Sequence, residues 1–447
     1  MFVAPFAAAA QDGPPPNRDP DIASIVREIS AKNIQATIET LVAFKTRHTL
    51  SDPTSSTVGI GAARNWIKSE LERYSRESGG RLEVAFDGYI QHPAPPRIMQ
   101  PVEIVDVVAT LPGRQPESSG RVYVVSGHYD SRSLNVLVPD KDAPGANDDA
   151  SGTAAVMELA RVMSHHDYAA TIVFLAVAAE EQGLFGAKHW ADEAKKNQVD
   201  VAAMMTNDII GSSHGDSGQI DRHHVRVFAE GVPPAQPMSE DTLAQIRTGG
   251  ENDFPTRELG RAIREAAQAY VPDMDVAIVY RRDRFLRGGD HSPFLDDGFP
   301  AVRFTEPNED FHHQHQDPRV ERGIRYGDLL EFDDFDYIAN VARVNAAALA
   351  TLARAPGSPR QVEVETVKLE NDTVLRWSAN PEPDLAGYRV VWRETTAPFW
   401  EHRAWVGKAT SYRAVGISKD SFIFGVEAVD RGGHASPAVY PKPRKTN

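Results

Sequence analysis

Histidine and carboxylate residues recur in this sequence directly after apolar runs, where they could bind a metal ion. The first pair is His128 and Asp130, which follow the apolar run at 122–127. Residues two apart share a face in an extended backbone, so the carboxylate can orient the imidazole. Such a pair is also common in ordinary loops, where a histidine is held by its neighbours without any ligand.

Two adjacent carboxylates, Glu180 and Glu181, follow the nine-residue apolar run at 171–179. Like charges this close raise one another's pKa unless a cation lies nearby. No Lys or Arg follows in sequence until Lys188. A bound metal ion is therefore the economical counter-charge, although an Arg distant in sequence could also supply it.

Asp148 lies in a loop of small and polar residues at 145–152 (GANDDASG) that leads into a helical pattern. Asp and Ser are favoured as helix caps, and two acids beside Asn in a Gly-rich turn are equally typical of a metal-binding loop. The motif alone leaves both interpretations open.

Two further groups complete the set of metal-binding side chains. Asp208 follows another apolar run, at 201–207, and the segment at 311–317 (FHHQHQD) holds three histidines, His312, His313 and His315. A solvated polar loop is the alternative for the histidine segment.

The chain contains no cysteine, so thiol nucleophiles, disulfides and thiolate metal sites are excluded. A donor set of imidazole and carboxylate suits zinc, with cobalt or manganese as substitutes. Two metal ions that share one carboxylate would use five such ligands.

The apolar runs themselves predict the fold that positions these residues. Strand-like segments at 122–127, 171–179, 201–207 and 300–306 alternate with helical patterns, including a long one at 335–355. This alternation predicts an α/β fold with a mainly parallel central sheet covered by helices on both faces. Ligands bind at the carboxyl ends of the strands in such sheets, which is where the candidate residues lie.

The composition changes at Pro356, and short strand-like runs about ten residues apart follow without a helical period. They predict a small all-β sandwich, and the order of Trp377, Tyr388 and the run FGVEAVD resembles a fibronectin type III module. The expected organisation is a signal-peptide remnant or disordered tail (1–20), a catalytic domain (21–355), a linker (356–360) and the β-sandwich (361–447).

The charge balance excludes several classes of partner. The 447-residue chain carries 48 Lys and Arg against 63 Asp and Glu, a net charge of −15, which disfavours binding to nucleic acids and anionic membranes. It has no apolar run of eighteen residues, so no transmembrane segment is expected. Its apolar start, MFVAPFAAAA, ends in small residues and predicts export, to the periplasm or the outside of the cell.

Taken together, the motifs HYDSR, PGANDDASG, AAEEQGLFGA, NDIIG, GGDHSPF and FHHQHQD resemble the two-zinc aminopeptidase family over residues 35 to 355. That family includes bacterial secreted aminopeptidases, glutamate carboxypeptidase II and glutaminyl cyclase. The resemblance implies a zinc-dependent aminopeptidase that binds two Zn²⁺ ions and a peptide substrate.

The resemblance also implies a role for each matched residue. The metal ligands are His128 and Asp208 on one zinc, Glu181 and His313 on the other, and Asp148 between them. Glu180 is the general base and Asp130 holds the tautomer of His128. A cis peptide bond between Asp148 and Asp149 is expected.

Some positions depart from the family pattern. The choice of His313 depends on Asp317, which follows it by four residues as an aspartate follows the family's ligand. Asp290 and His291 stand where the family has a Ser-Asp-His motif, so a role in the substrate pocket is expected. The segment from Gly250 to Arg287, with its Arg-rich run RRDRFLR, matches no family pattern and is expected in substrate binding, a lid or a solvated surface.

Several functions remain open on these residues. Within the superfamily, the alternatives are a carboxypeptidase or dipeptidase, or a one-zinc glutaminyl cyclase. A non-catalytic binding protein on the same fold is the alternative from another class. The C-terminal module is expected to contact a polymer or a cell surface.

Overall fold

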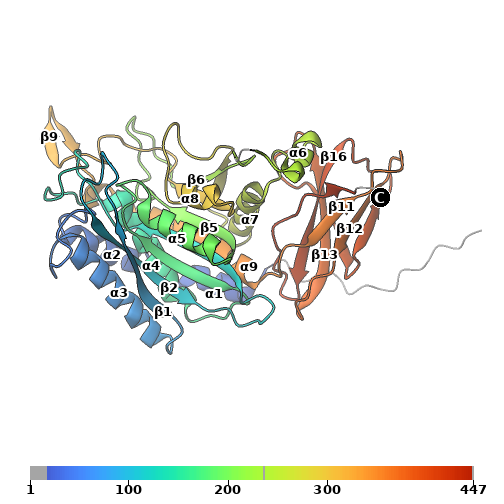
Figure 1. Cartoon of the computed structure of the whole chain (residues 1–447), viewed down its shortest axis with the longest axis horizontal. Coiled ribbons are helices and arrows are strands. Elements are labelled where there is room, and N and C mark those ends of the chain that lie inside the picture. Colours follow the sequence, from blue (N-terminus) through green and yellow to red (C-terminus); the bar gives the residue numbers. More distant parts are fainter. Residues whose placement is uncertain (1–17, 235–236, 445–447) are drawn as a thin grey trace, which may run out of the picture. The chain divides into compact units, whose positions relative to one another are not determined.

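A computed structural model describes residues 18–234 and 237–444. It divides into two compact units (Figure 1). Among the described residues, the larger unit comprises 20–234, 237 and 254–353, and the smaller one comprises 18–19, 238–253 and 354–444. The segment 238–253, expected in the catalytic domain, therefore groups with the β-sandwich instead.

The larger unit is built on an eight-stranded sheet in the order β1-β2-β4-β3-β5-β8-β6-β7. Its strands are β1 (Glu83–Gln91), β2 (Val102–Leu111), β3 (Arg121–His128), β4 (Thr171–Val177), β5 (Asp200–Asn207), β6 (His224–Ala229), β7 (Asp275–Val279) and β8 (Ala301–Thr305). The central strands β4, β3, β5 and β8 are parallel to one another, and antiparallel pairs flank them. The predicted mainly parallel sheet is confirmed.

Helices cover both faces of this sheet. Neighbouring residues of the central strands point to opposite sides, so an apolar strand presents an apolar surface on each face, and helices bury both surfaces. On one face Val125 and Phe174 pack in a core with α4 (Gly152–Met163) and α9 (Phe335–Arg354). On the other face Val124 and Leu175 pack against α5 (Phe185–Lys196) and α8 (His291–Asp296). The continuous apolar sequence of β4 follows from this burial on both sides.

The remaining helices of the larger unit are α1 (Pro20–Glu28), α2 (Ala31–Ala43), α3 (Gly59–Glu77) and α7 (Pro255–Tyr270). Helices α1 to α3 place their apolar residues in the same core as α4. A short helical turn, η1 (Ala146–Ser151), precedes α4, and a 3-10 turn, η2 (Leu330–Phe332), precedes α9. The strands β9 (Arg319–Glu321) and β10 (Ile324–Tyr326) form a small hairpin.

The smaller unit contains two β-sheets that share one core, as the sequence predicts for a sandwich. One sheet has the order β15-β12-β11-β17 and the other β14-β13-β16. Their strands are β11 (Arg360–Val364), β12 (Thr373–Ser378), β13 (Leu385–Glu394), β14 (His402–Gly407), β15 (Ser411–Ala414), β16 (Phe422–Asp430) and β17 (Lys442–Pro443). Trp377 of the first sheet and Tyr388 of the second pack edge to face in this core. The helix α6 (Glu240–Arg247) belongs to the same unit.

The apolar start of the chain, on which the prediction of export depends, lies outside the described residues. Among the residues that the structure does describe, none of the helices combines the length and the apolar character that crossing a bilayer requires.

Candidate metal centre

The predicted site residues meet at the carboxyl ends of three neighbouring strands. His128 is the last residue of β3, Asp208 directly follows β5, and Glu180 and Glu181 lie just beyond the end of β4. These strands are adjacent in the sheet order, so their ends bring residues from distant parts of the chain to one edge.

Asp148 stands at the centre of this group and faces two sets of side chains. Its Oδ1 lies 3.1 Å from His128 Nε2, and the same nitrogen lies 3.8 Å from Asp208 Oδ1. Its Oδ2 lies 2.9 Å from His315 Nε2, which is 3.0 Å from Glu181 Oε1. The result is two triads with spacing that suits metal ligands, and Asp148 belongs to both.

The prediction that His313 is the fifth member of this group is wrong, because the structure brings His315 there instead. The imidazole of His313 stacks on Phe332 at 3.7 Å between ring centroids and lies 3.6 Å from Asp310. The spacing argument also fails, since Asp317 pairs with Lys141 at 2.6 Å.

Orphaned polar atoms show that the group fits a metal ion. His128 Nε2 and Glu181 Oε1 are buried and make no well-directed hydrogen bond among the described residues, although another proposed ligand lies 3.1 and 3.0 Å from them. An unpaired buried polar atom costs free energy, so these two atoms are poised for a ligand. Imidazole nitrogen and carboxylate oxygen are the donors that zinc prefers in sites without thiolate.

The pKa shifts show how strongly negative the site is. Burial lowers the pKa of His128, but the carboxylates of Asp149, Asp130 and Asp148 outweigh it and hold this pKa well above its usual value. Burial is likewise outweighed at His315, where Glu181 and Asp148 raise the pKa to about 10. The surrounding carboxylates therefore favour positive charge at both imidazoles, and bound metal cations would supply that charge.

Glu180 and Asp290 form a second carboxylate pair beside the two triads. Burial raises the pKa of Glu180 well above its usual value, and the nearby charges of Asp208 and Glu181 raise it further. Asp290 is 1% exposed, both of its carboxylate oxygens lack a hydrogen-bond partner among the described residues, and its pKa is raised by burial and then by Glu180. The expected role of Asp290 in a substrate pocket stays a prediction.

His291 lies apart from this pair. It is fully buried, and its Nε2 is 2.8 Å from the carbonyl oxygen of Arg282. Burial lowers its pKa to about 4, so it is neutral and supports the backbone of the preceding loop.

Asp130 supports the group, as predicted from its spacing. Its carbonyl oxygen is 3.1 Å and its carboxylate Oδ1 is 3.4 Å from His128 Nδ1, so this side of the imidazole is held and Nε2 faces the two triads. The same carboxylate accepts hydrogen bonds from the backbone N–H groups of Glu180 and Glu181. Asp130 therefore contacts His128 through its backbone carbonyl and holds the backbone of Glu180 and Glu181 through its carboxylate.

Two further carboxylates hold the loop around Asp148 and were not singled out from the sequence. Asp149 accepts a hydrogen bond from the backbone N–H of His128 at 2.9 Å, and Asp328 accepts from those of Asn147 and Asp148 at 2.8 and 2.7 Å. The expected cis peptide bond between Asp148 and Asp149 is present.

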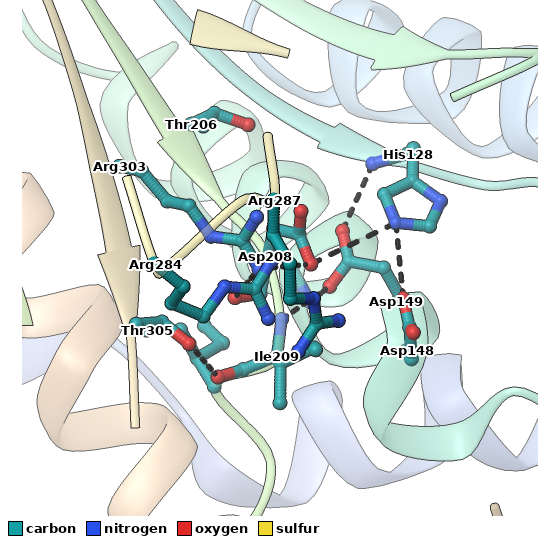
Figure 2. A network of polar contacts seen from close by, with 12 residues as sticks. His128, Asp148, Asp149, Thr206, Asp208, Ile209, Arg284, Arg287, Arg303 and Thr305 are labelled. Carbon is teal, nitrogen blue, oxygen red and sulfur yellow. Dashed lines mark hydrogen bonds and ion pairs between the residues drawn. The ribbon is translucent and has the colours of Figure 1, made fainter. Parts of the chain in front are cut away.

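Besides these two carboxylates, Arg303 was not singled out from the sequence. Its guanidinium is fully buried and lies 2.9 Å from Asp208 Oδ1 (Figure 2). An Arg distant in sequence was considered as a counter-charge for the glutamate pair, but this one pairs with Asp208 instead. A lone arginine in the otherwise apolar strand AVRFT is the signal that could have indicated a buried ion pair.

Arg303 belongs to a network of charges beside Asp208 that also includes Arg284 and Arg287 (Figure 2). It lies 3.5 Å from Asp283, which pairs with Arg284 at 3.2 Å. Arg284 and Arg287 both reach Glu309, at 3.1 and 3.0 Å. The Arg-rich segment that matched no family pattern therefore forms part of the wall beside Asp208.

This fold and site define a class of metallopeptidase, and the comparisons identify the family. Residues 106–324 match the model of peptidase family M28. The chain is 51% identical over 429 residues to a probable zinc metalloprotease of Leptosphaeria maculans, covering 96% of this chain and 98% of that one. It is 52% identical over 431 residues to a probable zinc metalloprotease of Pyricularia oryzae, covering 95% and 85%. The chain belongs to peptidase family M28.

Solved structures show the same fold at low sequence identity. The Legionella pneumophila LapA aminopeptidase superposes with a TM-score of 0.52 at 19% identity, over 79% of this chain and 80% of that one. An aminopeptidase from Aneurinibacillus sp. strain AM-1 superposes with a TM-score of 0.51 at 15% identity, over 75% and 97%.

Proposed function

We propose that this protein is a zinc-dependent exopeptidase that hydrolyses the N-terminal peptide bond of peptides and uses two metal ions. The observation that carries the proposal is the position of Asp148, which belongs to two triads of ligands at once. A carboxylate shared in this way is the arrangement that two-metal hydrolytic sites use. The relatives named as probable zinc metalloproteases support zinc and peptide hydrolysis.

In this proposal His128, Asp208 and Asp148 hold one ion, and Glu181, His315 and Asp148 hold the other. When bound, such a pair of ions polarises the scissile carbonyl and lowers the pKa of a coordinated water. Two of these ligands are held by groups outside the triads, His128 by Asp130 and Asp208 by Arg303, which fixes that side of the site before substrate arrives.

Glu180 is the general base of the proposed reaction. It takes a proton from the attacking water and delivers it to the nitrogen of the leaving amine. Its pKa, raised by burial and by the neighbouring carboxylates, suits a group that must both accept and donate a proton. Asp290 is the residue proposed for the substrate pocket, and its buried carboxylate adds to the negative charge around Glu180.

A panel of aminoacyl-anilides and N-blocked dipeptides, assayed with and without a chelator, tests the proposal. We expect cleavage of substrates with a free N-terminus, and loss of that cleavage on chelation. Cleavage of only the N-blocked substrates would instead favour a carboxypeptidase.

The one-zinc glutaminyl cyclase is distinguished by metal content and by product. A cyclase would bind one ion and release ammonia from peptides that begin with glutamine. The non-catalytic alternative predicts no turnover of any substrate at any metal concentration. Because the five proposed ligand positions are all occupied by imidazole or carboxylate, we favour the catalytic alternative.

We also propose that the protein is exported and that the β-sandwich is a fibronectin type III-like module that contacts a polymer or cell surface. Retention of the purified protein on insoluble cell-wall material, compared with a variant that lacks residues 361–447, tests the second part. Equal retention of both proteins would contradict it.

A further inference from the structure

The buried arginine beside Asp208 distinguishes the two proposed metal positions. Arg303 lies in β8 and is fully buried. Its Nη2 is 2.9 Å from Asp208 Oδ1, which is also the carboxylate oxygen within 3.8 Å of His128 Nε2. The oxygen that completes the triad of His128, Asp148 and Asp208 is therefore already paired with a cation (Figure 2).

The other triad has no such competitor. The ion-pair partner of Glu181 Oε1 and of Asp148 Oδ2 is the imidazole of His315, and among the described residues no guanidinium or ammonium group pairs with either oxygen. Arg97 is close to Glu181, but it donates to the backbone carbonyl and leaves the carboxylate free for a ligand.

Arg303 is also fixed in place, so it cannot swing away when an ion arrives. Its Nη1 donates to the carbonyl oxygen of Gly288 at 2.8 Å and lies 3.5 Å from Asp283 Oδ2. The backbone of Gly289 closes over it so tightly that a Cβ there would stand 2.7 Å from Nη1. These contacts hold the charge of Arg303 beside Asp208.

We propose that Arg303 makes the two metal positions unequal, so that the position of His128 and Asp208 binds its ion more weakly and fills second. This inference rests on the proposed two-metal function. The guanidinium withdraws electron density from Asp208 Oδ1, and its positive charge repels the metal ion that would bind to this oxygen. An ion at this position must compete with the charge-assisted hydrogen bond between Arg303 and Asp208. From the usual strength of such a bond, we expect the zinc dissociation constants of the two positions to differ roughly tenfold to a hundredfold.

Equilibrium dialysis of the chelator-stripped, full-length protein against a series of zinc buffers tests this inference. Bound zinc per chain is measured by mass spectrometry, without reference to activity. For the unaltered protein we expect two separate binding steps. Asp208→Asn should abolish the weaker step, and Glu181→Gln should abolish the tighter one.

The charge of Arg303 is then tested with a matched pair of variants. Arg303→Gln keeps a hydrogen-bond donor but removes the charge, so the weaker step should tighten until the two constants lie within roughly threefold of each other. Arg303→Lys keeps a charge and should keep the two steps apart. If Arg303→Gln alone prevents folding, the same measurement is made on the double variant Arg303→Gln with Asp283→Asn. The second change removes the carboxylate of Asp283, which would otherwise lose its contact with Arg303.

The outcomes separate this inference from the proposed function. If both ions bind the unaltered protein in one step, or if Arg303→Gln weakens the second step further, Arg303 serves only to hold Asp208 and the inference is overturned. If Asp208→Asn abolishes the tighter step, the assignment of the weaker position is overturned. Binding of one ion at most, at every zinc concentration, would instead refute the two-metal function itself.

Discussion

Glu309 holds together three arginines in the wall of the site, and replacing it with Gln has an effect that the structure allows us to estimate. Its carboxylate pairs with Arg226 at 3.0 Å, Arg284 at 3.1 Å and Arg287 at 3.0 Å, and it accepts a hydrogen bond from Gln314 at 2.8 Å. Gln314 precedes His315 in sequence, so this carboxylate also anchors the loop that carries a proposed ligand.

The pKa of Glu309 gives the size of the effect. Burial acts to raise this pKa, but Arg284, Gln314 and Arg287 outweigh it and lower it from 4.5 to about 2. A difference of this size between unfolded and folded protein corresponds to about 3 kcal/mol of folding free energy. Because the folded-state pKa is the lower one, this contribution is fully present above pH 4.5 and is lost as the pH falls toward 2.

Urea denaturation of the metal-free protein at several pH values measures the difference. At pH 7 we expect Glu309→Gln to lower the free energy of unfolding by about 3 kcal/mol, and we expect the gap to narrow by about 2 kcal/mol by pH 3. Glu321→Gln is a matched control, since Glu321 is exposed and pairs only with Arg319, at 3.3 Å, among the described residues. We expect that variant to lose less than about 0.5 kcal/mol. A loss for Glu309→Gln that is equal at pH 7 and pH 3 would refute the electrostatic explanation.

Three further predictions concern the metal centre. Glu180→Gln should lower kcat at least ~100-fold while zinc content, measured by mass spectrometry, stays at the unaltered level; full activity in this variant would contradict its role as the base. His315→Ala should lose bound zinc and peptidase activity together, whereas His313→Ala should keep both, and the opposite pattern would restore the original choice of ligand. Asp148→Asn should weaken the binding of both ions, and a variant that loses only one ion on dialysis would show that Asp148 is not shared.

The position of the site was predictable because it follows from strand topology. A parallel strand that is buried on both faces must be apolar throughout, so its end is marked where the apolar run meets a His, Asp or Glu. Runs ending near His128, Glu180 and Asp208 could be recognised in this way, and the structure brings all three residues to one edge of the sheet. The same reasoning did not single out β1, whose half-exposed sequence EVAFDGYIQ lacks a continuous apolar run.

The choice among the three histidines was not predictable from spacing, because it depends on local backbone conformation. His315 has a positive φ of 58°, which turns its side chain to a direction that a regular turn would not give. His313 is drawn aside by stacking on Phe332, which lies nineteen residues later in the chain. Neither the positive φ of His315 nor the stacking of His313 could be recognised from the sequence of the segment itself.

Arg303 shows a different limit of sequence reasoning. A charge in an apolar strand indicates that a partner must exist, but the partner is chosen by the fold. Asp208 follows β5, which pairs with β8 in the sheet, and the register of this pair puts Arg303 opposite Thr206, two residues before Asp208. The sequence lacks any local signal for that neighbourhood.

The central claim, a hydrolytic site that needs two ions, is tested most directly by restoring zinc to the metal-free protein in steps. Peptidase activity on an aminoacyl-anilide and bound zinc per chain are measured in the same samples. We predict no activity without metal and a rise that is complete only when two ions are bound per chain. Full activity without metal, or with a single bound ion, would contradict the account.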